Sequence, residues 1–191
     1  MISVRTAALA LCCVGFPATA AVPADPAIVP LFEAACTKGE LSFAAREAAI
    51  AADSEWVAQA VSDVNVQSFG AVPVKPVSMN FNYSKPLVVK QWNRSVGGST
   101  VRVVLAQFDP KRRYPNLCAV VVANVQQSAM DYIDLYRPVV EAVGLRGKSV
   151  DLAHYFEFSG KLPDGHPVRS DIFTRSSVLG SGKTMHMYLA F

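Results

Sequence analysis

The sequence predicts an α+β domain: a mostly antiparallel sheet, built from a meander, a helix and three further strands, with N-terminal helices packed on one face. Residues 117–125 are apolar or Cys at eight of nine positions, which is typical of a central strand covered on both faces. Residues 87–94 and 100–108 enclose Gly97 and Gly98, the pattern of a β-hairpin that leads into this strand. Helical periodicity falls in separate blocks before and after this meander, which favours α+β over alternating α/β.

Before the meander, the spacing of apolar residues predicts three helices. The first begins near Pro26, places Cys36 on its apolar face and ends at Gly39. The second covers residues 42–52 and is rich in alanine. A third, short helix is expected within residues 53–61, where polar residues at the start can cap it. This helical region is the expected cover for one face of the sheet.

After the meander, a helix is predicted over residues 128–143. Ser128 and Asp131 resemble a capping box at its start, and a glycine follows its end. Pro138 lies inside the helix, so we expect a kink or a break near Arg137. Four more strands complete the expected sheet: residues 152–158, 171–179 and 184–191, and an edge strand at residues 79–83 between prolines.

The first twenty residues have the features of a secretory signal peptide. Arg5 precedes an apolar run at residues 7–16, and a small-x-small motif ends at Ala20. The run is too short for a transmembrane helix, and no later segment reaches transmembrane length. We expect cleavage near Ala20, which leaves residues 21–191 as a single α+β domain in the periplasm or outside the cell.

Two cysteines remain after this cleavage, and an oxidising compartment favours a disulfide between Cys36 and Cys118. The alternative is a pair of free buried thiols. Cys12 and Cys13 leave with the signal. A lipid anchor on either is a weaker alternative, because a small residue should precede a lipidated cysteine and Leu11 precedes Cys12.

Charge is distributed unevenly along the chain. Residues 21–70 carry seven acidic and two basic residues, whereas residues 85–113 carry seven basic residues and one acidic residue. Such a division suits either an anionic partner or two oppositely charged segments that face each other.

The candidate anion-binding set consists of six basic residues of the meander: Lys90, Arg94, Arg102, Lys111, Arg112 and Arg113. Aromatic residues lie near them, a combination that suits phosphate or carboxylate groups. Arg102 is expected across the hairpin and close to Arg94. Successive turns of a meander lie at opposite ends of the sheet, so residues 111–113 should be about 20 Å from this pair. We therefore expect a stripe or two patches; the alternative is a solvated face partly neutralised by the acidic helices.

No complete catalytic, nucleotide-binding or metal-binding motif is present, and no cofactor is expected. Residues 180–184 lack the first glycine of a phosphate-binding loop, and a hairpin turn accounts for their glycines. Residues 185–187, Met-His-Met, hold copper-type ligands, but in a strand the methionines face one side and His186 the other. The methionines are instead expected in the core.

Together these features predict an exported, non-catalytic binding or accessory protein of the bacterial cell envelope. Its partner is an anionic envelope component or another envelope protein. The first alternative is a small hydrolase that uses Asp151, His154 and Ser170, although His154 also fits a core position. The second is a subunit of an envelope assembly, which should offer an open sheet edge or an exposed apolar patch at residues 79–83 or the C-terminal strand.

Overall fold

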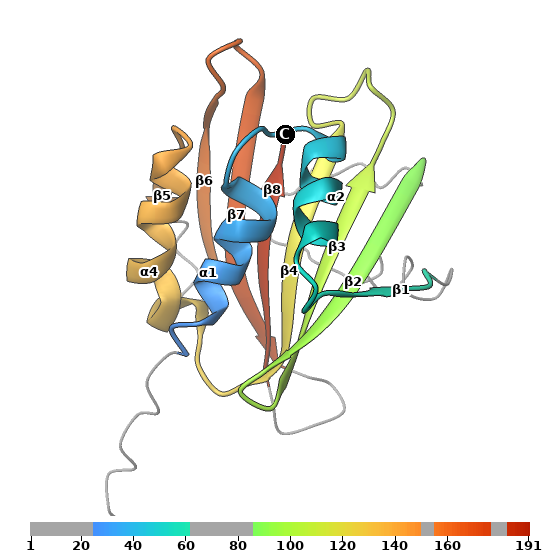
Figure 1. Cartoon of the computed structure of the whole chain (residues 1–191). Coiled ribbons are helices and arrows are strands. Elements are labelled where there is room, and N and C mark those ends of the chain that lie inside the picture. Colours follow the sequence, from blue (N-terminus) through green and yellow to red (C-terminus); the bar gives the residue numbers. More distant parts are fainter. Residues whose placement is uncertain (1–24, 62–85, 150–154, 177–182) are drawn as a thin grey trace, which may run out of the picture.

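The eight described strands form one antiparallel sheet, and the described helices lie on the same side of it (Figure 1). The computed structural model describes residues 25–61, 86–149, 155–176 and 183–191. The strand order is β1-β2-β3-β4-β8-β7-β6-β5, and every described neighbouring pair is antiparallel. The predicted α+β class, with N-terminal helices on one face, is confirmed.

The strands are β1 (Val57–Gln59), β2 (Val88–Val96), β3 (Ser99–Gln107), β4 (Asn116–Val125), β5 (Arg146–Ser149), β6 (Tyr155–Lys161), β7 (Pro167–Ser176) and β8 (Lys183–Ala190). The predicted hairpin and meander are formed by β2, β3 and β4. Gly97 and Gly98 make the two-residue turn between β2 and β3, with φ angles of 54° and 81°. Both angles are in the left-handed region that hairpin turns of this type need and that glycine adopts without strain.

The predicted central strand, β4, lies between β3 and β8 in the middle of the sheet. On the side of the helices Cys118, Val120 and Val122 are completely buried. On the other side Ala119 is also buried, but Val121 is half-buried. The strand is therefore central, as expected, although its second face is covered less completely than the apolar run predicted.

The described helical segments are α1 (Ile28–Phe32), η1 (Glu33–Thr37), α2 (Phe43–Ala52) and α4 (Ala129–Ala142). The first predicted helix is present, but its second half, η1, is a π-helix. The second predicted helix is α2, whose Ser42 side chain accepts a hydrogen bond from the Ala45 N–H at 3.2 Å. Such a cap satisfies one of the free donors at a helix start.

Helix α4 begins with the predicted capping box, in which Asp131 Oδ2 accepts from the Ser128 backbone N–H at 2.7 Å. The helix then continues through Pro138, so the alternative of a break near Arg137 is wrong. Pro138 removes the hydrogen bond to the carbonyl of Asp134, and both residues lie on the exposed side of the helix. Water can reach that carbonyl, which explains why the helix tolerates the proline.

Three other predictions need correction. The third helix expected within residues 53–61 is absent; the chain forms β1 instead, which pairs with β2 and satisfies its backbone groups there. Strand β5 was not predicted, because four residues that include a glycine give no periodic signal. Strand β6 ends later, and β7 starts earlier, than the apolar pattern indicated. The expected edge strand at residues 79–83 lies outside the described residues.

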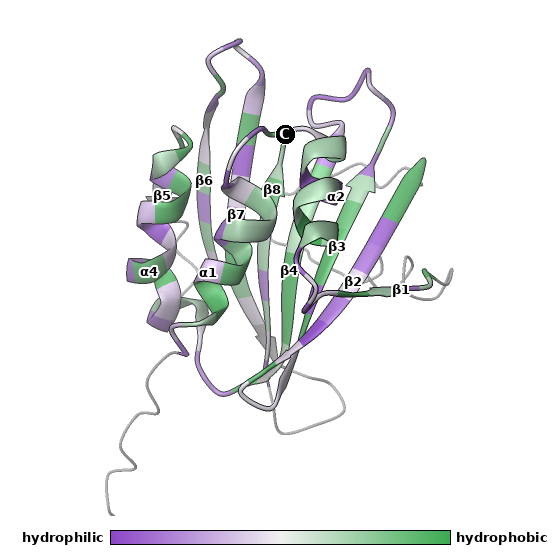
Figure 2. Ribbon diagram, in the orientation of Figure 1, coloured by the Kyte–Doolittle hydropathy of each residue, from purple (hydrophilic) through white to green (hydrophobic). Residues whose placement is uncertain are grey.

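The core fills the space between helices and sheet. Three rings connect α1, α4 and β6: Phe32 and Tyr136 have centroids 5.0 Å apart, and Tyr136 and Phe158 have centroids 5.8 Å apart. Met185 and Met187 are completely buried on this side, which confirms their predicted core position. In Figure 2 the hydrophobic colour is concentrated along β3, β4 and α2, the elements that meet at this core.

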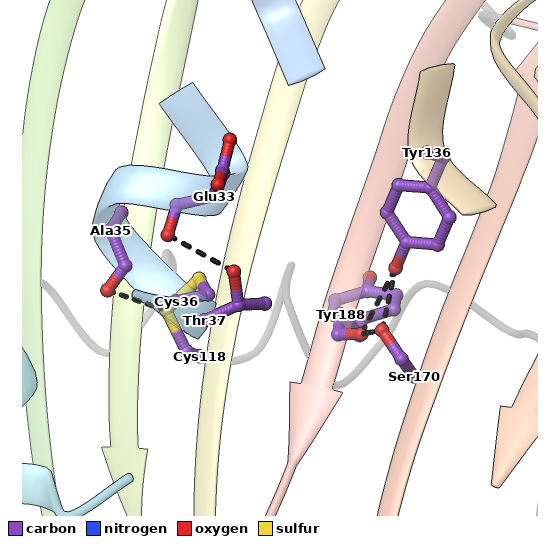
Figure 3. Close-up of a disulfide and its surroundings, with 8 residues drawn as sticks. All are labelled: Glu33, Ala35, Cys36, Thr37, Cys118, Tyr136, Ser170 and Tyr188. Atoms are coloured by element: carbon purple, nitrogen blue, oxygen red, sulfur yellow. Dashed lines mark hydrogen bonds between the residues drawn. A yellow bond between two sulfur atoms is a disulfide. The ribbon is translucent and has the colours of Figure 1, made fainter. Parts of the chain in front are cut away.

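A disulfide between Cys36 and Cys118 joins η1 to the central strand (Figure 3). The two Cα atoms are 5.5 Å apart, both side chains are completely buried, and the carbonyl oxygen of Ala35 lies 3.8 Å from Cys118 Sγ. The predicted pairing is therefore present. Among the described residues, no helix is both long enough and apolar enough to cross a bilayer.

Reducing the disulfide should destabilise the fold strongly. The bond closes a loop between residues 82 positions apart, for which loop entropy gives about 4 to 5 kcal/mol of stabilisation. Urea denaturation of the oxidised protein, the reduced protein and a Cys36→Ala/Cys118→Ala variant measures this difference. The reduced and double-alanine proteins should share a lower midpoint than the oxidised protein. Coincident curves for all three would contradict the expectation.

Candidate functional site

The structure separates the six predicted anion-binding residues into three places. In the β2–β3 register Arg94 lies opposite Val101, and Asn93 lies opposite Arg102. Side chains alternate along a strand, so Arg94 and Arg102 project from opposite faces of the sheet. The expectation that these two arginines lie close together on one surface is therefore wrong, because the two-residue turn at Gly97 and Gly98 pairs Arg94 with Val101.

Lys90 and Arg94 face the helices and meet carboxylates there. Lys90 Nζ lies 3.0 Å from Glu47 Oε1 of α2. Arg94 pairs with Asp53 at 3.1 Å and also with Glu55, both in the segment after α2. Its guanidinium carbon also lies 5.7 Å from the centroid of the Trp56 ring. The acidic helical region thus neutralises these two cations, which is the alternative that the charge distribution left open.

Lys111, Arg112 and Arg113 occupy the turn between β3 and β4, at the opposite end of the sheet from Gly97 and Gly98. Arg112 lies over the Phe108 ring at 5.1 Å, and Arg113 over the Tyr114 ring at 5.3 Å. Lys111 and Arg113 are exposed, and no carboxylate of the described chain lies within ion-pair distance of either. We call residues 111–113 the basic turn; its Lys111 and Arg113 present their positive charge to solvent.

The sheet face opposite the helices carries a polar cluster that the sequence did not reveal. We call this surface the helix-free face, because none of the described helices covers it (Figure 1). The strand registers place several ionisable and hydroxyl-bearing residues of β6, β7 and β8 on it, and the polar cluster is made of these: Tyr155, Glu157, Arg169, Asp171, His186 and Tyr188. Asp171, between Glu157 and Tyr188 in the register, is only 1% exposed.

Arg169 is the centre of this cluster. Its Nε donates to both carboxylate oxygens of Asp171, at 3.2 and 3.1 Å. Its NH2 group donates to the Tyr155 hydroxyl oxygen at 2.6 Å and lies 3.1 Å from Glu157 Oε2. The Tyr155 hydroxyl in turn donates to Asp171 Oδ1 at 3.0 Å. These contacts cross-link β6 and β7 through polar side chains.

Burial dominates the protonation of this cluster. Desolvation raises the pKa of Asp171 to about 6, against the opposing effect of Arg169. Burial also raises the pKa of Tyr155 above its usual range. Desolvation works to lower the pKa of Arg169, but Asp171, Tyr155 and Glu157 outweigh it and raise that pKa. Burial therefore favours the protonated form of Asp171, whereas Arg169 stays charged.

An aromatic row continues the cluster towards the middle of the sheet. The Phe173 and His186 rings stack with centroids 4.8 Å apart and planes 9° apart, and His186 Nδ1 lies 3.0 Å from the Tyr188 hydroxyl oxygen. Met185 and Met187 lie on the other face, in the core. His186 and the two methionines therefore cannot ligate one copper ion, as the strand alternation predicted.

The hydrolase candidate Ser170 lies beneath α4, on the side of the helices. Its hydroxyl donates to the Tyr188 carbonyl oxygen at 2.6 Å and lies 2.6 Å from the Tyr136 hydroxyl, and the residue is completely buried (Figure 3). Burial holds the pKa of Tyr136 well above its ordinary value. Asp151 and His154 lie outside the described residues. Ser170 therefore has the environment of a core hydroxyl rather than that of an activated nucleophile.

The sequence gives only a weak indication of the polar cluster. Arg169, Asp171 and Phe173 recur at a spacing of two, as do Tyr155 and Glu157, but only the β6–β7 register brings the two sets together. Comparisons of the chain with protein-family models, curated proteins and solved structures found no match.

Asp171 should make stability depend on pH. Its pKa is about 6 in the folded protein against an ordinary value of 3.8, so the folded state binds this proton more tightly than the unfolded state. The free energy of unfolding should therefore fall as pH rises from about 4 to about 6, by on the order of 2 to 3 kcal/mol from this group.

The measurement is urea unfolding between these pH values for the wild type, Asp171→Asn and, as a control, Asp134→Asn on the exposed face of α4. The Asp171→Asn variant should lose this component of the pH dependence, and Asp134→Asn should keep it. Parallel pH profiles for all three proteins would show that Asp171 does not hold the proton.

Proposed function

We propose that the protein is an exported, non-catalytic binding or accessory protein of the cell envelope that contacts an anionic partner. The observation that carries the proposal is the basic turn, residues 111–113. Two of its guanidinium groups lie against aromatic rings, and two of its cations are exposed with no described carboxylate in ion-pair distance. The phosphate or carboxylate groups of an envelope component suit such a turn.

The remaining predicted cations contribute less to this surface. Lys90 and Arg94 are already compensated by Glu47, Asp53 and Glu55. An exposed, ion-paired cation adds little to the binding of an external anion, because its charge is locally cancelled. We therefore place the contact with the anionic partner at the basic turn, at one end of the sheet, and not along a basic stripe.

The proposed location outside the cytoplasm is supported by the disulfide between Cys36 and Cys118. Persistent disulfides are typical of oxidising compartments such as the bacterial periplasm. The signal-like residues 1–20 support the same location. The environment of Ser170 supports a non-catalytic role. Ser170 is the one candidate hydrolase residue that the structure describes, and its hydroxyl is buried beneath α4.

The test is co-sedimentation with phosphatidylglycerol vesicles and, in parallel, with anionic cell-wall fragments, at low salt and at raised salt. A cation near an anionic surface contributes about 1 kcal/mol, so Lys111→Ala/Arg112→Ala/Arg113→Ala should weaken binding by about two orders of magnitude. Raised salt should weaken wild-type binding in the same direction. Phosphatidylcholine vesicles should retain neither protein.

A charge-matched control separates the basic turn from net charge. Lys38, Arg137 and Lys161 are exposed and lie outside the turn, and replacing all three by alanine removes the same charge. This control variant should bind nearly as well as the wild type. If both triple variants lose binding equally, net charge rather than the turn is responsible. If neither loses binding, the proposed contact is wrong.

A further inference from the structure

An exposed apolar side chain lies at the same end of the sheet as the basic turn. Leu87, directly before β2, is 67% exposed, more than any other large apolar residue of the described chain. Its backbone N–H donates to the carbonyl oxygen of Gln107 at 2.7 Å, which holds Leu87 beside the last residue of β3. The chain enters the β3–β4 turn at the next residue, Phe108. Figure 1 accordingly shows the start of β2 and the turn after β3 at one end of the sheet.

Aromatic rings and cations lie together in this turn. Phe108 and Tyr114 are half-buried, and the guanidinium groups of Arg112 and Arg113 lie 5.1 and 5.3 Å from the centroids of their rings. Lys111 and Arg113 are exposed. We call the surface made by Leu87, Phe108, Tyr114 and the basic turn the basic end of the sheet.

The charge of the basic end suits an anionic surface. Residues 109–113 hold three cations and one carboxylate, that of Asp109, which gives a net charge of 3 − 1 = +2. Asp109 Oδ1 accepts from the Lys111 backbone N–H at 2.9 Å, so this carboxylate shapes the turn and offsets only one of its positive charges. A net positive charge therefore remains to attract an anionic partner.

Leu87 distinguishes between the two anionic partners that suit the basic turn. A cell-wall polymer is hydrated, so a contact with it leaves the leucine side chain in water. A bilayer has hydrocarbon directly beneath its phosphate groups, where an apolar side chain is removed from water. Binding at a bilayer surface increases with the apolar area buried and with attraction to anionic lipids, and aromatic residues are enriched at the membrane–water interface. The basic end combines all three features.

We propose that the anionic partner of the basic turn is the surface of a phospholipid bilayer and that Leu87 is the apolar anchor of this contact. Lys111 and Arg113 contact the headgroup phosphates, and the Leu87 side chain inserts between the headgroups towards the acyl chains. We name here the partner of the same site, so this inference rests on the proposed function of the basic turn. One leucine and three cations give a reversible attachment rather than a permanent one.

The first experiment compares phosphatidylglycerol vesicles with anionic cell-wall fragments in co-sedimentation of the disulfide-bonded protein at low salt. Leu87→Asn should weaken vesicle binding about tenfold, because removing a leucine side chain from water contributes enough for this factor. The same variant should bind cell-wall fragments like the wild type. Leu135→Asn, at an exposed leucine of α4, is the matched control and should bind vesicles like the wild type. Because Leu87 is exposed, Leu87→Asn should keep the wild-type midpoint in urea, which shows that it is folded.

A second measurement reports insertion directly. In Leu87→Trp, the fluorescence of the indole at this position should be quenched by phosphatidylglycerol vesicles with brominated acyl chains. Trp56 and Trp92 are only 8% and 5% exposed, so the wild type gives the background quenching. Leu135→Trp should stay at that background. This readout does not depend on a variant that binds less well.

Three results would overturn the inference about the bilayer. The first is that Leu87→Asn binds vesicles like the wild type, or weakens vesicle and fragment binding equally, since Leu87 is then not an anchor in lipid. The second is quenching of Leu87→Trp no greater than the background. The third is retention of the wild type by cell-wall fragments but not by vesicles, which identifies a polymer as the partner.

The variant Lys111→Ala/Arg112→Ala/Arg113→Ala separates these failures from a failure of the proposed function. If this variant loses binding to vesicles or fragments while any of the three results is obtained, the basic turn is still the contact and only the bilayer inference is wrong. If it binds both like the wild type, the basic turn is not the contact, and the proposed function and the bilayer inference are both wrong.

Discussion

The covalent link between η1 and β4 organises the helical layer on the sheet. Cys118 lies in the middle of the central strand, and Cys36 in a π-helical segment directly before the turn into α2. Both cysteines are completely buried, so the bond holds η1 against the sheet inside the apolar core. The bond adds to the apolar packing of α1 and α2 on the sheet, in which Phe32 and Ile50 are buried, and both helices are too short to be stable alone.

The two faces of the sheet are stabilised in different ways. Towards the helices, valine, methionine and aromatic side chains remove apolar surface from water and need no specific partner. On the helix-free face, β6 and β7 are held by Arg169, Asp171 and Tyr155, whose polar atoms satisfy one another. A charge this deeply buried is stable only with such partners.

The charged residues of this protein have two separate roles. Acidic residues in and after α2 hold Lys90 and Arg94 of β2, which secures the edge of the sheet near β1. Lys111 and Arg113 of the basic turn between β3 and β4 form no ion pair with a carboxylate of the described residues. The basic segment of this chain therefore has two parts. The cations of β2 pair with acidic residues inside the protein, and the exposed cations of the basic turn face solvent.

The sequence by itself determined the local features. Apolar periodicity located α2, α4 and the central strand, paired glycines located the β2–β3 turn, and the two cysteines outside the signal-like segment indicated the disulfide. The periodicity and the paired glycines are local signals that neighbouring residues define, and the disulfide followed from the number of cysteines. Strand β1 escaped prediction because its pairing with β2, and not its own composition, makes it a strand.

Only the tertiary structure decided which side chains share a surface. A shift of one residue in the hairpin register would have placed Arg102 beside Arg94, and only the observed register sets it opposite Asn93. The polar cluster likewise depends on the pairing of β6 with β7, which brings Tyr155 and Glu157 next to Asp171 and Arg169. A two-residue turn fixes the register of the β2–β3 hairpin, whereas packing over the whole sheet fixes the pairing of strands far apart in the sequence, such as β4 and β8, and no single stretch of sequence contains that information.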